Sequence, residues 1–218
     1  MRALRVKQEY GPTLGALLAP RWRAASRPAR AALTAAGVLA VAALAGLALT
    51  LENARYRHAG GGVSFGFEYR GLYRTAPGPG ELVRLQARWP DGRLKYAYAV
   101  SPLRLARYAI EPDTQVALYA SGLVRRLART VPHFELRGEG KTKVNNTLIG
   151  YEIAYYTRAE GERLFARDVL LLPPGEAHPR EGVLVWMLNA AGAVAAVRSP
   201  LEVGETGVLL RPLKTFSF

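Results

Sequence analysis

Val83–Val100, VRLQARWPDGRLKYAYAV, predicts two antiparallel strands joined by a tight turn. Apolar and polar residues alternate on both sides of Pro90-Asp91-Gly92, as they do in half-buried strands. Proline fixes φ and glycine accepts positive φ, so these three residues are typical of a turn. We therefore expect the body of the chain to be an antiparallel sheet.

The same alternation recurs outside this hairpin. An earlier strand is predicted at Val63–Tyr69, where every second residue is apolar or aromatic. Turn residues such as Gly138-Glu139-Gly140 separate the later candidates. These are Phe134–Arg137, Lys141–Val144, Leu148–Thr157, Arg163–Leu172 and Val183–Leu188. A terminal helix or half-helix, interrupted by Pro212, is expected within Gly204–Phe218.

One long helix is predicted between the strands. It begins near Asp113, which can cap it together with Thr114, and it stops at Pro132. Apolar residues follow at helical spacing and should face the sheet; they are Val116, Tyr119, Leu123, Leu127 and Val131. The predicted fold class is α+β, with an antiparallel sheet flanked by helices.

An uncharged stretch, Ala31–Leu51, lies between Arg30 and Glu52. A helix of about 20 residues spans the hydrocarbon core of a bilayer, so we expect a single transmembrane helix in contact with membrane lipid. Small residues recur at every fourth position, Ala32, Ala36 and Ala40. This spacing fits close helix pairing, which leaves a homo-oligomer possible.

Charge on the two sides of this stretch predicts its orientation. Residues 1–30 carry seven basic residues and one acid, whereas only Arg55 and Arg57 follow closely behind it. The positive-inside rule therefore places the N-terminus in the cytoplasm. A cleaved signal peptide is the alternative, but it would have a shorter basic region and an apolar core of about 7 to 15 residues. An uncleaved anchor fits better.

Four parts of the chain follow from these patterns. They are a basic cytoplasmic arm at 1–30, a transmembrane helix at 31–51, a glycine-rich linker at 52–62 and an extracytoplasmic α+β domain at 63–218. Gly60-Gly61-Gly62 would supply a flexible joint in the linker. The predicted location is the cell membrane.

Composition limits the chemistry of the domain. The chain has no cysteine, which excludes disulfides, thiolate metal sites and cysteine nucleophiles. Of the net charge of +13, +6 lies in residues 1–30, and the remaining +7 is spread along the rest of the chain and not gathered into one run, so nucleic acid is not an expected partner. The histidines lack zinc-site spacing, and no phosphate loop or nucleophile elbow is complete. We expect no cofactor, no metal and no catalytic residues.

The order of elements resembles the Mog1/PsbP-like family. The resemblance rests on Val63–Tyr69, the helix after Asp113, the strand pair around Leu148-Ile149-Gly150-Tyr151, the hairpin that follows, and the closing Lys214–Phe218. It implies an antiparallel sheet flanked by helices in a membrane-tethered module that binds or assembles and does not catalyse. No site residues are transferred from it.

One carboxylate pair depends on strand register. If the hairpin after Leu148 is centred on Glu160, Glu152 faces Asp168, and the two acids would raise one pKa or bind a cation. A register shifted by one residue sets Glu152 against Arg167 in an ordinary salt bridge. The first arrangement would suit an envelope enzyme.

Aromatic and basic residues offer a candidate binding surface. Tyr96 and Tyr98 lie among arginines, and Arg125 and Arg129 lie near the end of the predicted helix. Such a mixture suits a protein or an envelope polymer, although tyrosines on strands also form packing pairs. The leading hypothesis is a membrane-anchored binding or assembly module for an envelope component or a membrane complex. An enzyme using Glu152 and Asp168, or a structural subunit of a membrane oligomer, is the alternative.

Overall fold

The computed structural model describes residues 26, 28, 34–36, 38–39, 53–106, 112–145, 148–159, 161–174 and 180–218. The chain divides into two units, residues 1–52 and 53–218. Within the first unit, residues 28, 34–36 and 38–39 are helical. The rest of the predicted transmembrane stretch and nearly all of the basic arm lie outside the described residues. Among the described residues, no helix is both long enough and apolar enough to cross a bilayer.

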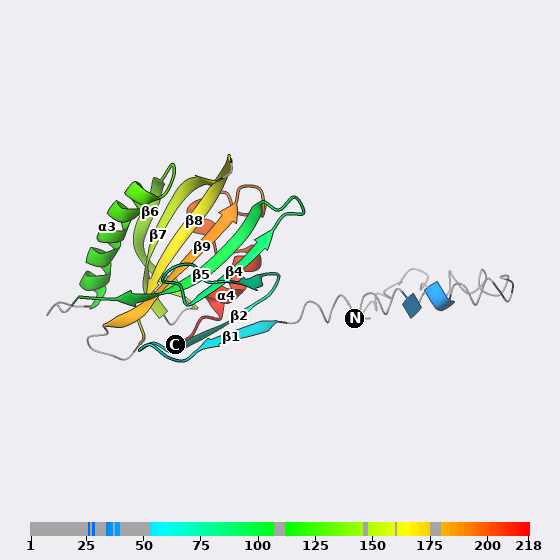
Figure 1. Cartoon of the computed structure of the whole chain (residues 1–218), viewed down its shortest axis with the longest axis horizontal. Helices are drawn as coiled ribbons and strands as arrows, with labels where there is room; N and C mark the ends of the chain where they lie inside the picture. Colours follow the sequence, from blue (N-terminus) through cyan, green and yellow to red (C-terminus); the bar gives the residue numbers. More distant parts are fainter. Residues whose placement is uncertain are drawn as a thin grey trace, which may run out of the picture. The chain divides into compact units, whose positions relative to one another are not determined.

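The second unit is built on an antiparallel sheet of seven strands in the order β3-β4-β5-β9-β8-β7-β6 (Figure 1). The strands are β3 (Tyr73–Thr75), β4 (Val83–Arg88), β5 (Leu94–Arg104), β6 (Glu135–Val144), β7 (Leu148–Ala159), β8 (Glu162–Leu171) and β9 (Glu181–Ala190). β4 and β5 pair on either side of Pro90-Asp91-Gly92, which confirms the predicted hairpin. The structure is α+β and dominated by the sheet.

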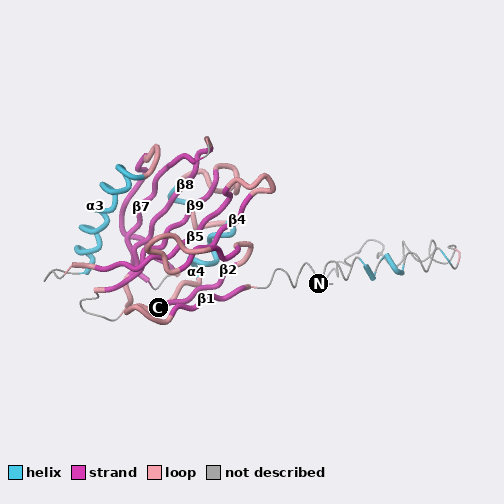
Figure 2. Tube along the Cα trace, viewed as in Figure 1, coloured by secondary structure: helices cyan, strands magenta, loops and turns pink. Residues whose placement is uncertain are grey.

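Helix α3 (Pro112–Thr130) covers one face of the sheet beside β6 and β7 (Figures 1 and 2). Its buried residues Val116, Ala120 and Leu123 pack with Ile153 of β7 and Leu170 of β8. Apolar spacing along the helix produces this contact, because residues three and four apart share one face. The helix predicted between Asp113 and Pro132 is therefore confirmed.

The opposite face is covered by a second, two-stranded sheet and the C-terminal segment. The small sheet consists of β1 (Ala54–His58) and β2 (Phe65–Tyr69). The C-terminal segment contains the 3-10 turns η1 (Pro200–Glu202) and η2 (Gly207–Leu209) and the short helix α4 (Leu210–Lys214). Phe67 of β2 lies 5.0 Å from Tyr98 of β5, between ring centroids. Aromatic packing thus joins the two sheets.

Two predicted boundaries are corrected by the structure, and a third prediction is confirmed. β1 lies within the predicted linker 52–62. The sequence did not indicate this strand, because Tyr56 is its one buried residue and the alternation around it is short. The predicted turn at Gly138-Glu139-Gly140 is part of one continuous strand, β6, with a bulge between Leu136 and Gly138. The terminal half-helix is confirmed as α4. Pro212 is tolerated there because the first turn of a helix has backbone N–H groups without intrahelical acceptors.

Candidate functional site

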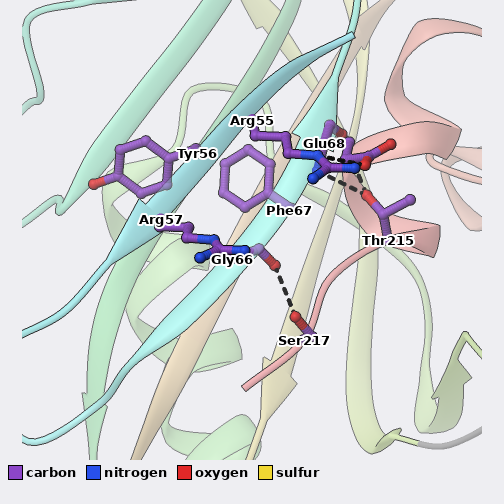
Figure 3. Close-up of a pocket in the computed structure, with 8 residues that line it drawn as sticks. All are labelled: Arg55, Tyr56, Arg57, Gly66, Phe67, Glu68, Thr215 and Ser217. Carbon is purple, nitrogen blue, oxygen red and sulfur yellow. Dashed lines mark hydrogen bonds and ion pairs between the residues drawn. The ribbon is translucent and has the colours of Figure 1, made fainter.

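A pocket of 240 Å³ lies between the small sheet and the C-terminal segment (Figure 3). Its lining residues come from three stretches that are far apart in the sequence. They are Arg55, Tyr56, Arg57, Gly66, Phe67, Glu68, Thr215 and Ser217. Alternation along β1 turns Tyr56 into the core and leaves the two flanking arginines exposed. The pocket is therefore basic along one side.

Glu68 is held by two arginines at one end of this pocket. Arg55 Nε donates to Glu68 Oε1 over 2.9 Å, and Arg211 Nη2 donates to Glu68 Oε2 over 2.7 Å. The hydrogen bond from Arg211, with a smaller contribution from Arg55, holds the pKa of Glu68 below its ordinary value. This carboxylate is ionised at neutral pH and neutralises part of the local positive charge.

The C-terminal segment is fixed against β2 by polar contacts. The backbone N–H groups of Gly66 and Ser217 each donate to the other residue's carbonyl oxygen over 2.9 Å. Two residues further along β2, the Glu68 N–H donates to Thr215 Oγ1 over 2.8 Å. The hydroxyl groups of Thr215 and Ser217 are thus placed at the pocket by backbone pairing.

Arg57 is the group in this pocket that is free to bind a ligand. Its side chain is exposed and makes no hydrogen bond or ion pair in the part of the chain that the structure describes. It lies alongside Gly66 (Figure 3), and a Cβ on that glycine would come within 3.5 Å of Arg57 Cγ. A guanidinium beside a hydroxyl group can hold a carboxylate or phosphate.

The four residues predicted as a binding surface do not come together. Tyr96 and Tyr98 are buried in the core between the two sheets, where Tyr96 Oη donates to the Ala193 carbonyl over 3.0 Å. Burial raises the pKa of both phenols. Arg125 and Arg129 are exposed on α3, which covers the opposite face of the sheet. The prediction that these four residues share one binding surface is therefore wrong, because the two tyrosines are packed in the core.

The carboxylate pair is corrected by the register of β7 and β8. Glu152 pairs with Val169, and Asp168 pairs with Ile153. The hairpin is thus displaced by one residue from a register centred on Glu160, and the two acids point to opposite faces. Glu152 shares its face with Arg167, so the ordinary salt bridge is the arrangement that the structure shows.

Arg167 is almost fully buried, with 4% of its side chain exposed. Its Nε and Nη2 donate to Glu152, and its Nη1 donates to Glu205 Oε1 over 2.6 Å. The remaining N–H groups reach the Val203 carbonyl at 2.9 Å and Thr142 Oγ1 at 3.3 Å. The guanidinium therefore joins β6, β7 and β8 to the segment after η1.

Asp168 lies on the face covered by α3, beside Tyr155 and Trp186. Trp186 Nε1 donates to Tyr155 Oη over 3.3 Å, and Tyr155 hydrogen-bonds Asp168. The Oδ2 atom of Asp168 has no hydrogen-bond partner among the described residues. Burial raises the pKa of Asp168 to about 7, against a smaller lowering by Tyr155. At neutral pH much of this carboxyl group is protonated.

Sequence reasoning missed the pocket itself. Arg55 and Arg57 were visible only as charges behind the apolar stretch, and nothing in a single sequence indicates that Thr215 and Ser217 return to β2. The available signal was the alternation Arg55-Tyr56-Arg57, which is a short strand pattern inside a segment that otherwise reads as a linker.

Comparisons with known proteins give a fold and no family. No protein-family model matches the chain, and no curated protein matches it. The crystal structure of LpqN, involved in cell envelope biogenesis of Mycobacterium tuberculosis, matches with a TM-score of 0.51 and 6% identity. That match covers 76% of this chain and 91% of LpqN. The chain shares a fold with LpqN; membership of the Mog1/PsbP-like family stays a prediction.

A second solved structure, a protein of unknown function from Pseudomonas aeruginosa, matches with a TM-score of 0.33 and 14% identity. This match covers 63% of the present chain and 83% of the other. Similarity at this level carries no argument about fold or function.

Replacing Glu152 should destabilise the domain through Arg167. Glu152→Ala leaves a buried guanidinium without its main counter-charge, so we expect a loss of about 3 kcal/mol in the free energy of unfolding. The double variant Glu152→Met and Arg167→Met removes both charges and should recover much of that loss. Urea denaturation measures all three proteins. Glu139→Ala, at an exposed position on β6, is the control, and a Glu152→Ala effect no larger than the control's would contradict the interpretation.

Asp168 should make stability fall as pH rises towards neutrality. Its folded-state pKa of about 7 exceeds the ordinary value of 3.8, so the folded protein keeps a proton that the unfolded chain releases. The resulting stabilisation is complete below pH 3.8 and is lost by about pH 7, at up to about 1.4 kcal/mol per pH unit.

Asp168→Asn tests this directly, because asparagine does not titrate and still accepts the Tyr155 hydrogen bond. The difference in unfolding free energy between wild type and variant should favour wild type at pH 4 and shift towards the variant by pH 8. Parallel pH profiles for the two proteins would show that Asp168 does not titrate in this range.

Proposed function

We propose that this chain is a single-pass protein of the cell envelope whose extracytoplasmic domain binds an anionic component close to the membrane. The observation that carries the binding role is the pocket beside β1 and β2, in which Arg57 has no counter-charge among the described residues. The ligand is the headgroup of an anionic phospholipid. The domain is a binding module and not an enzyme.

Chain connectivity supports a lipid ligand. Arg55 and Arg57 follow Leu51, the last residue of the apolar stretch, by four and six positions. Even a fully extended chain advances only about 3.3–3.6 Å per residue. If the stretch spans the bilayer, the Cα atoms of both arginines are confined within roughly 14 to 22 Å of the membrane surface, where anionic headgroups are concentrated.

The fold supports an envelope setting, and the carboxylates give no support to catalysis. LpqN, which shares the fold, is itself involved in cell envelope biogenesis. The enzyme alternative required Glu152 and Asp168 on one face, and they lie on opposite faces. A structural subunit of a membrane oligomer remains a prediction that crosslinking with and without residues 1–51 would examine.

Location is tested on the full-length protein. We expect it in the membrane fraction, resistant to extraction by carbonate, because a 21-residue apolar stretch is more stable in lipid than in water. Protease added outside intact spheroplasts should digest residues 53–218. Recovery of the full chain in the soluble fraction, or a protected C-terminal part, would contradict this location.

The pocket is tested with residues 53–218, which form a compact unit without the apolar stretch. This fragment should co-sediment with vesicles containing phosphatidylglycerol and leave vesicles of phosphatidylcholine alone in the supernatant. Arg57→Gln should weaken binding about fivefold, since one basic residue near an anionic surface contributes about 1 kcal/mol.

Arg104→Gln is the matched control. Arg104 is exposed over 79% of its side chain, lies outside the pocket and contacts Glu181 only at 4.0 Å, so it reports the loss of one positive charge away from the pocket. The two variants should differ, with the larger effect at Arg57. Equal effects would mean that only net charge matters, and the absence of a preference for phosphatidylglycerol would exclude a headgroup ligand.

A further inference from the structure

A second pocket, of 450 Å³, lies where β7, β8 and the loop before β6 meet. It is lined by His133, Glu135, Tyr156, Thr157, Arg158 and Arg163. It shares no residue with the pocket beside β1 and β2. In Figure 1 the end of β7 and the start of β8 lie at the top of the domain, whereas β1 and β2 lie at the bottom. The site therefore goes beyond the proposed function and does not depend on the membrane anchor.

Two arginines face each other directly across this hairpin. Arg158 of β7 pairs with Arg163 of β8, an arrangement of like charges that destabilises a sheet. Arg158 has no ion pair or side-chain hydrogen bond within the described part of the chain. An unfavourable pair of this kind is stabilised when an anion binds between the two guanidinium groups.

Glu135 compensates only part of this charge. Its carboxylate oxygens lie 3.6 Å from Arg137 Nη1 and 3.9 Å from Arg163 Nη2, which is longer than a hydrogen bond. Arg137 and Arg163 thus share this one loosely held carboxylate, and Arg158 has no acidic partner within the described part of the chain. Among the described residues, the three arginines carry two positive charges more than Glu135 neutralises.

Tyr156 holds two of these arginines in place. The guanidinium carbon of Arg163 lies 3.7 Å from the centre of the Tyr156 ring, and that of Arg137 lies 5.3 Å from it. The ring itself packs edge-on against Phe165 at 5.3 Å. A guanidinium stacked on an aromatic ring keeps its N–H edge free, so these groups are oriented for a ligand before it arrives.

The loop above the strands is fixed and strained. Thr157 Oγ1 donates to the Pro132 carbonyl over 2.8 Å, which ties the loop to β7. The next residue, His133, has φ of 52°, a conformation that non-glycine residues adopt at an energetic cost. Such strain concentrates at functional sites, and here it belongs to a residue that lines the pocket.

We propose that this pocket binds phosphate, either as inorganic phosphate or as the phosphate group of a monoester. A monoester carries about −1.5 to −2 charges at pH 7, which matches the two uncompensated positive charges, whereas a carboxylate would neutralise only one. Arginine recognises phosphate through paired N–H donors, and two arginines, Arg158 and Arg163, line the pocket. The phosphate is either free or attached to an organic group of the envelope, for which the pocket leaves room.

Titration calorimetry of the full-length protein in maltoside micelles tests this, with inorganic phosphate and glucose 1-phosphate as probes and glucose as the uncharged comparison. We expect both phosphates to bind and glucose not to bind. Similar affinities for the two phosphates identify the free anion as sufficient. Tighter binding of glucose 1-phosphate shows that the attached group also contacts the pocket.

Variants with opposite expected effects keep the test independent of folding. Arg158→Gln and Arg163→Gln should each raise Kd about tenfold, because each removes a charged hydrogen-bond donor. Glu135→Gln should lower Kd about threefold by removing the competing carboxylate. Arg57→Gln, in the other pocket, should leave Kd unchanged.

Three results would overturn the proposal. The first is that neither phosphate binds to the wild-type protein. The second is that Arg158→Gln and Arg163→Gln bind as well as wild type. The third is weaker binding by Glu135→Gln, which would give that carboxylate a supporting and not a competing role.

Discussion

The guanidinium of Arg167 constrains more of this structure than any other side chain described in it. A buried charge is tolerated only when its hydrogen-bonding groups are satisfied, and arginine has five N–H donors to satisfy. All five have acceptors here, from Glu152, Val203, Glu205 and Thr142. These acceptors belong to β6, β7 and the segment after η1, so the three elements must meet at one point on the sheet. A shifted hairpin or a displaced C-terminal segment would move some of these acceptors away from the Arg167 guanidinium.

This constraint reaches both pockets. Downstream of Val203 the chain passes through α4 and returns to β2, where Thr215 and Ser217 complete the pocket that contains Arg57. In the other direction, the register that brings Glu152 beside Arg167 is the register that sets Arg158 opposite Arg163 at the end of the same hairpin. The favourable ion pair in the middle of the hairpin therefore fixes a register that places two like charges opposite each other at its tip. The tip is exposed, where repulsion is weakened by solvent, so the buried pair decides the register.

Local patterns predicted the elements well and the contacts between them poorly. The β4–β5 hairpin and α3 follow from alternation, turn residues and helical spacing, which are properties of neighbouring residues. The facing of Glu152 and Asp168 depended on one residue of register, and the loop that decides this gave no unambiguous signal. Tyr96 and Tyr98 were assigned to a surface because of what alternation along a strand can show. It shows that the two faces of the strand differ, but not which face is covered by other elements. The pocket beside β1 needs a C-terminal segment that returns across the whole domain, a contact that periodicity does not encode.

Arg167 and Asp168 are adjacent residues of β8, and both are buried. The surroundings of Arg167 stabilise its charged form, whereas the surroundings of Asp168 favour its neutral form. On the side of Arg167, two carboxylates, a carbonyl and a hydroxyl converge, so the charged form is stabilised. On the side of Asp168, Tyr155 supplies a hydrogen bond while Oδ2 has no partner in the part of the chain that the structure describes, so the neutral form is favoured. A carboxyl group with a raised pKa is a common mark of an active site, but only when substrate can reach it. Asp168 is 2% exposed, on the face of the sheet that α3 covers, so a substrate could reach it only by displacing packed side chains. The raised pKa is thus a consequence of packing at this position, and the exposed, preformed arginine groups at the two ends of the domain are the features that suit a ligand.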